Sequence, residues 1–168
     1  VLPKVIKAGG LAGPEDKVNL SCFLSIHNLR SHGILMSMLE ASAFLGMDKW
    51  EYLVWFKQAL SDSQFLYRLA APLALSQWTL YKATEPTFPL CDTPVLGTNE
   101  HLMVALSPKL LLEVNLRVRT DESTWRVKEG VHKSKLREFR RLTIRNTFKE
   151  IIFHDRDRLE EWRMLSEF

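Results

Sequence analysis

Apolar residues recur at three- and four-residue steps through the first half of the chain, which is the spacing of an amphipathic helix. The longest run covers residues 18–45, and we expect one helix there, bent at Gly33. Asp16 provides a helix start, and Gly46 provides the C-terminal stop that a left-handed cap needs.

Shorter helices are expected to follow this first one. Asp48 with Glu51 three residues later matches a capping box, which is typical of a helix N-terminus. The apolar face of this second helix would consist of Trp50, Leu53, Val54 and Leu60. Residues 64–76 predict a third helix, which Pro72 would kink or shorten.

The second half of the chain changes to strand-like patterning. Aromatic and branched residues predict strands at 78–81, 101–106 and 151–153. Residues 110–118 fit either state, and their alternation favours a strand. Residues 119–130 are polar and are expected to form a loop.

Helical patterning returns near the C-terminus. Residues 133–147 predict a basic helix, and Asp155 would begin a last amphipathic helix with Leu159, Trp162 and Leu165. The whole pattern predicts an α+β fold: a helical N-terminal half packed on a small, mainly antiparallel sheet, with a late basic helix and a C-terminal helix.

The length of 168 residues fits one domain with its own core. Residues 1–15 contain Gly9, Gly10, Gly13 and Pro14, so we expect an arm or linker there and a single domain over residues 16–168. The chain opens at Val1 without a methionine, which is compatible with a fragment of a longer chain whose N-terminal segment is missing.

Composition excludes several protein classes. Two isolated cysteines, Cys22 and Cys91, do not make a disulfide framework and favour a reducing, cytoplasmic setting. No apolar run approaches the roughly 20 residues that span a bilayer, so no membrane segment is expected. The histidines and cysteines lack metal-ligand spacing, and no glycine-rich phosphate loop is present, so neither metal nor cofactor is expected.

The middle of the chain, residues 88–95, contains a single acid, Asp92, between Pro89 and Pro94. Prolines and an Asp–Thr pair are typical of a turn whose side chains bond to free backbone N–H groups. The other interpretation places Asp92 inward, beside a basic partner, since acids flanked by apolar residues tend to be paired.

A candidate partner lies on the first helix. His27 falls on the predicted apolar stripe, and Arg30 lies near its edge. With Asp92 they form a candidate catalytic cluster, in which Arg30 would clamp a phosphate or carboxylate and His27 would act as acid or base. A buried core histidine with a snorkelling arginine explains the same pattern.

The late helix is strongly basic. Residues 133–150 contain seven lysines and arginines against two glutamates, although the whole chain carries only +3. Four of the basic residues, Lys133, Arg137, Arg141 and Arg145, follow at four-residue steps. A local basic stripe is typical of phosphate binding, whereas a solvated helix face is the alternative.

The chain resembles a large, mostly bacterial, uncharacterised family, domain of unknown function 4238. The resemblance is based on a His27–Arg30 segment and Trp78, followed by the pieces Cys91-Asp92-Thr93-Pro94, Ala105-Leu106-Ser107-Pro108, and Arg145-Asn146 leading to Glu150-Ile151-Ile152-Phe153. The His-Tyr-Val-Pro opening of that family is absent here. The resemblance implies a shared fold and importance for Arg30 and Asp92, and it implies no reaction.

Two functions remain open at this point. The first is a nucleic-acid-directed effector of toxin or defence type, with RNA or DNA phosphate contacted by the basic helix. The alternative is a non-catalytic binding or assembly module with a protein partner, in which Arg30 and Asp92 form a structural pair.

Overall fold

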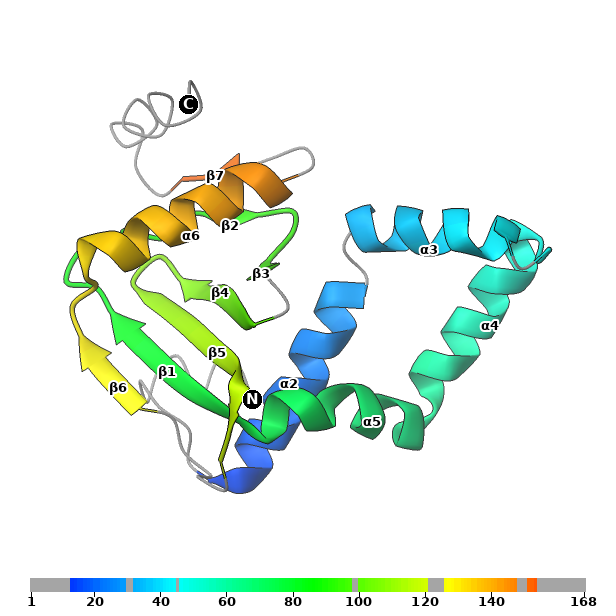
Figure 1. Cartoon of the computed structure of the whole chain (residues 1–168), viewed down its shortest axis with the longest axis horizontal. Coiled ribbons are helices and arrows are strands. Elements are labelled where there is room, and N and C mark those ends of the chain that lie inside the picture. The colour runs from blue at the N-terminus through cyan, green and yellow to red at the C-terminus, as the bar shows by residue number, and fades with distance from the viewer. Residues whose placement is uncertain are drawn as a thin grey trace.

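A five-stranded sheet lies at the centre of the computed structural model, which describes residues 13–29, 32–44, 46–97, 100–120, 126–147 and 151–153 (Figure 1). The strand order is β3-β4-β5-β1-β6, and all neighbours are antiparallel except β1 and β6, which are parallel. A two-stranded ladder pairs β2 with β7. The strands are β1 Ser76–Lys82, β2 Leu90–Cys91, β3 Val95–Gly97, β4 His101–Ser107, β5 Leu110–Arg119, β6 Arg126–Glu129 and β7 Ile151–Ile152.

Most of the described helices precede the sheet. They are α2 Pro14–Leu29, α3 His32–Phe44, α4 Lys49–Ser61 and α5 Ser63–Ala74, and α6 Lys133–Asn146 follows β6. In Figure 1, α6 crosses the sheet, and α3 and α4 project away from it. The predicted α+β class is therefore confirmed, as is a strand over residues 110–118.

The alternation of side chains along the strands supplies a separate apolar core for each face of the sheet. Trp78 and Leu80 of β1 point toward α2 and α5, whereas Tyr81 points toward α6. The first core comprises Leu20, Leu24, Leu73, Trp78, Leu80, Val95, Val104, Leu106, Leu110, Leu112 and Val114. The second comprises Tyr81, Phe88, Leu96, Met103, Leu111 and Phe139. The sheet thus lies between two helical layers.

The prediction of one long helix over residues 18–45 is wrong, because α2 ends at Leu29 and α3 begins at His32. The predicted stop at Gly46 is confirmed. Gly46 has φ +69°, its N–H donates to the carbonyl of Ala43, and the Met47 N–H donates to the carbonyl of Ser42. This pair of bonds is a Schellman motif, which uses glycine because it adopts positive φ without strain.

The second helix begins as predicted but buries a different face. Asp48 accepts from the Trp50 N–H at 2.7 Å and forms the capping box with Glu51. Trp50 and Val54, expected to face inward, are exposed. The buried residues of α4 are Tyr52 and Phe56, whose rings are stacked with centroids 6.3 Å apart.

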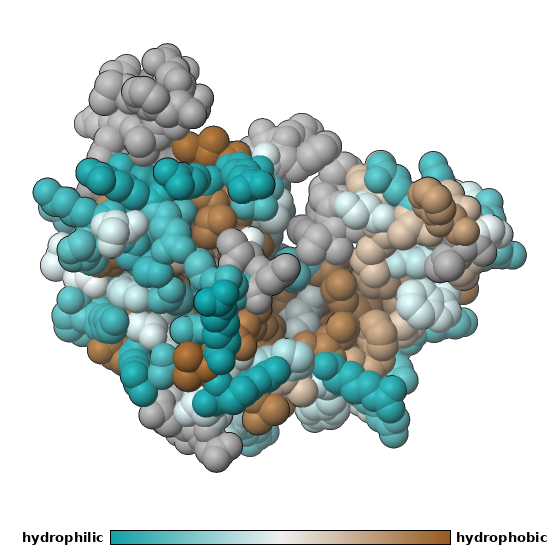
Figure 2. All heavy atoms as spheres, viewed as in Figure 1, coloured by the Kyte–Doolittle hydropathy of each residue, from teal (hydrophilic) through white to brown (hydrophobic). Residues whose placement is uncertain are grey.

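Exposed apolar side chains collect on the helical layer away from α6. Figure 2 shows hydrophobic side chains over these helices and a row of hydrophilic side chains along α6. The large exposed apolar residues of α2 to α5 are Phe23, Met36, Phe44, Trp50, Val54, Trp55 and Tyr67. The two helical layers therefore present surfaces of different character.

The polar loop predicted over residues 119–130 is wrong in part. Residues 126–129 form β6, which pairs with β1 and places Lys128 opposite Tyr81. The expected arm, apart from its last residues, and the expected helix after Asp155 lie outside the described residues.

Replacing Phe139 by alanine should destabilise the protein by about 3–5 kcal/mol, because the side chain is fully buried and its loss leaves a cavity. Phe139 packs edge-on against Phe88, with ring centroids 5.4 Å apart. The matched control is Phe44→Ala, since Phe44 is 96% exposed and should cost less than about 0.5 kcal/mol. Urea unfolding followed by circular dichroism measures both, and equal costs would contradict this assignment of the core.

Candidate nucleic-acid interface

Helix α6 presents one face to the sheet and the other to solvent. Phe139 is buried between α6 and the sheet, with Leu136 and Leu142 packed against the same core. His132 caps the helix, since its Nδ1 accepts from the Ser134 N–H at 3.3 Å. The apolar residues thus fix which side of α6 faces outward.

A chain of polar contacts beneath α6 joins the helix to three strands. Lys135 Nζ donates to Glu113 Oε1 at 2.6 Å and to Glu138 Oε2 at 2.8 Å. The Tyr81 hydroxyl donates to Glu113 Oε2 at 2.7 Å. At the other end, His101 Nε2 lies 2.6 Å from Glu138 Oε1. This polar network holds α6 at a defined rotation over β1, β5 and β4.

The polar network also shifts the ionisation of its members. Burial alone would lower the pKa of Lys135, but hydrogen bonds to Glu113 and Glu138 outweigh it and raise the pKa. Burial likewise opposes ionisation of Glu138, yet the contacts with Lys135 and His101 lower its pKa. The pKa of Tyr81 is raised by burial and by its bond to Glu113. At neutral pH, the Lys135 and Glu138 shifts favour the charged pair.

The predicted basic stripe lies on the solvent side of the same helix. Lys133, Arg137, Arg141 and Arg145 are all exposed. None of them forms an ion pair with a carboxylate in the part of the chain that the structure describes. Lys135, on the sheet side of α6, contacts two carboxylates. We use the name basic stripe for the four exposed residues.

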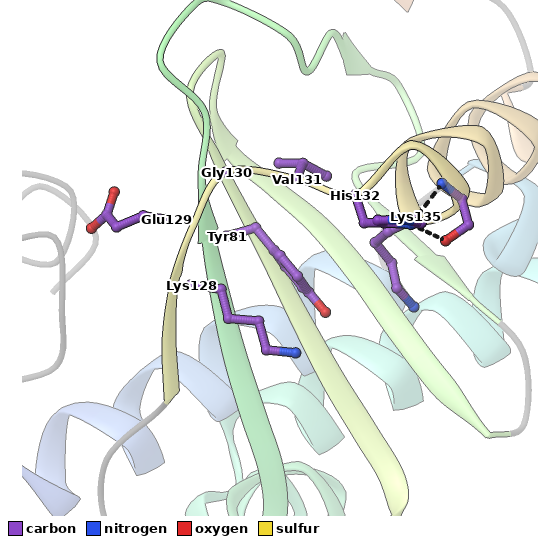
Figure 3. A pocket seen from close by; sticks show the side chains of 8 residues that line it. Tyr81, Lys128, Glu129, Gly130, Val131, His132 and Lys135 are labelled. Atoms are coloured by element: carbon purple, nitrogen blue, oxygen red, sulfur yellow. Dashed lines mark hydrogen bonds between the residues drawn. The ribbon is translucent and has the colours of Figure 1, made fainter.

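A pocket of about 670 Å³ adjoins the start of the basic stripe. It forms where Gly130, with φ +81°, turns the chain from β6 into α6. The Lys128 ammonium lies 5.5 Å from the centroid of the Tyr81 ring. Figure 3 shows Lys128 and Lys135 directed toward the space on either side of Tyr81. The lining residues are Tyr81, Lys128, Glu129, Gly130, Val131, His132, Ser134 and Lys135. We call this site the Gly130 pocket.

Of the three candidate catalytic residues, two are exposed and one lies outside the described residues. His27 is exposed on α2, where its ring meets Phe23 edge-on with centroids 4.9 Å apart, so its expected place on a buried stripe is wrong. Asp92 is exposed in the turn between β2 and β3, so its expected inward orientation is wrong. Arg30 lies outside the described residues, and its pairing with Asp92 stays a prediction.

Among the residues that the structure describes, no group of three or more histidine, cysteine or acidic side chains could hold a metal ion. In the same parts of the chain, no helix has the length and apolar character needed to span a bilayer. The expectations about cofactors, protein partners and cellular location stay predictions.

Comparison of the chain with protein families, with curated proteins and with solved structures finds no match. The resemblance to domain of unknown function 4238 therefore also stays a prediction.

Sequence reasoning missed the Gly130 pocket and the polar network. The sequence contained one signal for the network. Glu113 is an acid in an apolar strand, between Leu112 and Val114, which are both buried. An acid on such a strand needs a basic partner. No comparable signal marked Lys128, because its strand contains a single apolar residue, Val127.

The lowered pKa of Glu138 predicts a defined loss of stability in acid. The ionised Glu138 carboxylate stabilises the folded state at pH values above 4.5, the ordinary pKa of a glutamate. This contribution is lost as the pH falls through the lower pKa that Glu138 has in the folded state. Glu138→Gln should therefore destabilise the protein more at pH 7 than at pH 3.

Urea unfolding across this pH range measures the effect. Glu129→Gln is the matched control, because Glu129 has a 76% exposed side chain and pairs only with Lys82, at 3.3 Å, among the described residues. A constant difference between Glu138→Gln and the unsubstituted protein at both pH values would contradict the prediction.

Proposed function

We propose that this protein binds RNA or DNA through the phosphate backbone, using the basic stripe of α6. The observation that supports the proposal best is the division of cations on this helix. Lys135 is engaged by carboxylates of the protein, whereas Lys133, Arg137, Arg141 and Arg145 point outward and form no ion pair with the described carboxylates. An uncompensated row of cations attracts a polyanion.

The length of the basic stripe suits an extended polyanion better than a small one. From Lys133 to Arg145, the helix rises about 18 Å. Successive nucleotides of one strand rise about 3.4 Å, so the basic stripe is long enough for about five of them. Arginine and lysine side chains supply N–H groups that donate hydrogen bonds to phosphate oxygens.

The proposed binding would be independent of sequence. The one aromatic residue of α6, Phe139, is buried, so this helix supplies no exposed ring on which a base could stack. Contacts with phosphate fix position and add affinity, but they carry no direct information about base sequence. We therefore expect similar affinities for nucleic acids of different sequence at one length.

An effector activity of toxin or defence type would need a reaction in addition to binding. His27, Arg30 and Asp92 remain the predicted residues for it, and the α6 proposal does not depend on them. If binding is the whole function, the protein is the non-catalytic module expected as the alternative. His27→Ala should then leave nucleic-acid affinity unchanged, as measured by fluorescence anisotropy, whereas a loss comparable to that of an α6 variant would contradict this.

Reversing two charges of the basic stripe should abolish binding. Fluorescence anisotropy with labelled 20-nucleotide RNA and DNA should give a log K that falls linearly with log salt, with a slope up to about −2.8 for single strands and about −3.6 for duplex if all four cations are used. Arg137→Glu/Arg141→Glu should remove binding at moderate salt, because it removes two contacts and adds two repulsions.

The matched control is Lys49→Glu/Lys57→Glu on α4, which makes the same change in net charge at two exposed positions. This variant should retain most of the affinity. Equal losses in the two variants would indicate an effect of net charge alone and would contradict the assignment to α6. Binding to heparin or anionic vesicles with no binding to RNA or DNA would also overturn the proposal.

A further inference from the structure

The Gly130 pocket presents hydrogen-bond donors and few available acceptors. The Lys128 ammonium forms no ion pair with the described carboxylates and contacts the Tyr81 ring. The Lys135 ammonium has three N–H bonds, of which two donate to Glu113 and Glu138. Its remaining N–H bond is not used by either carboxylate, so both lysines retain donor capacity beside the pocket.

The carboxylates near the Gly130 pocket are already engaged. Glu113 accepts from Tyr81 and Lys135, and Glu138 contacts Lys135 and His101. Glu129 lines the pocket, but it pairs with Lys82 at 3.3 Å, and Figure 3 shows its carboxylate directed away from Lys128 and Tyr81. Of the two lysines that line the pocket, Lys128 is therefore the one that pairs with no described carboxylate.

His132 adds a further donor at the same place. Its Nδ1 accepts from the Ser134 N–H, so the neutral ring carries its proton on Nε2. Ser134 Oγ lies 2.8 Å from the same Nδ1. The start of α6 contributes the positive end of the helix dipole, which favours an anion in this position. A ligand rich in acceptors and negative charge matches this set.

We infer that the Gly130 pocket binds a terminal phosphate monoester of a nucleic-acid strand whose backbone lies along the basic stripe. The inference rests on the proposed function and specifies which part of the ligand enters the pocket. A monoester carries close to two negative charges at pH 7, against one for a backbone diester, and is therefore attracted more strongly by the Lys128 ammonium and by the remaining N–H of Lys135. The pocket volume of about 670 Å³ accommodates the phosphate with its nucleotide.

The position of the Gly130 pocket at one end of the basic stripe suits the end of a strand. The pocket is at the N-terminus of α6, and Lys133, the first residue of the basic stripe, lies between the lining residues His132 and Ser134. A strand that follows the basic stripe would reach the pocket at one end only. At this position a terminal monoester offers more negative charge to the pocket than an internal diester does.

The test compares otherwise identical labelled 10-nucleotide strands with a 5′-phosphate, a 3′-phosphate or hydroxyls at both ends. The unsubstituted protein should bind one phosphorylated form at least about fivefold more tightly than the hydroxyl form. Lys128→Ala and Lys128→Gln should abolish this preference while retaining affinity for the hydroxyl strand. Lys57→Ala on α4, an exposed lysine outside the pocket, should retain the preference.

The outcomes separate the two proposals. Loss of binding to all strands in Arg137→Glu/Arg141→Glu, with the phosphate preference unchanged in Lys128→Ala, would leave the proposed function standing and overturn the pocket inference. No binding of any strand to the unsubstituted protein would overturn both.

Competition identifies the source of the phosphate. Inorganic phosphate and a nucleoside 5′-monophosphate are titrated against the bound phosphorylated strand at constant ionic strength. Competition by the mononucleotide that Lys128→Ala removes would support the pocket. Equal competition by sulfate, phosphate and the mononucleotide, unchanged in Lys128→Ala, would indicate screening of charge and would overturn the inference.

Discussion

The contact of Lys135 with Glu113 and Glu138 determines what α6 presents to solvent. Successive residues of an α-helix are separated by about 100° around its axis, so fixing one polar side chain toward the sheet fixes the direction of all others. Phe139 provides much of the apolar attraction, but an apolar face alone tolerates some rotation. The short contacts from Lys135 to two carboxylates restrict it. The outward direction of the basic stripe follows from this constraint.

Basic residues on one helix can have opposite roles, and counting charges does not distinguish them. Lys135 and Arg140 belong to the same run as the basic stripe, yet the first is half-buried in the polar network and the second is buried. They contribute to the positive charge of the sequence, but neither belongs to the row of cations on the outward face of α6. Packing determines which cations form the outward row, and a count of charges along the sequence does not show it.

The sequence was informative where one periodicity dominates. Residues 133–147 and 110–118 have clear helical and alternating patterns, and both were identified correctly. The basic stripe followed from four-residue spacing alone. Prediction from the sequence failed where several local patterns compete. His27 is an example, because its buried position was predicted from a single long helix, whereas α2 ends at Leu29.

Asp92 and β6 show two other reasons why sequence reasoning failed. The prolines correctly predicted a turn around Asp92, but turn chemistry does not determine which side of the chain faces the core. Strand β6 is an edge strand with every residue exposed, so no burial pattern marked it. Its pairing with β1 depends on the tertiary fold, and the Gly130 pocket depends on that pairing.

The short parallel pairing of β6 with β1 has a consequence for the charge of the Gly130 pocket. Alternate residues of a strand face opposite sides, so a slip of one position would exchange the set of side chains above Tyr81. In the observed register, Lys128 lies opposite Tyr81, whereas its neighbours Val127 and Glu129 lie opposite Leu80 and Lys82. A register slip in β6 would thus replace the cation above Tyr81 by an apolar or acidic side chain. The positive charge above Tyr81 therefore depends on the register between β6 and β1 as well as on the presence of a lysine in β6.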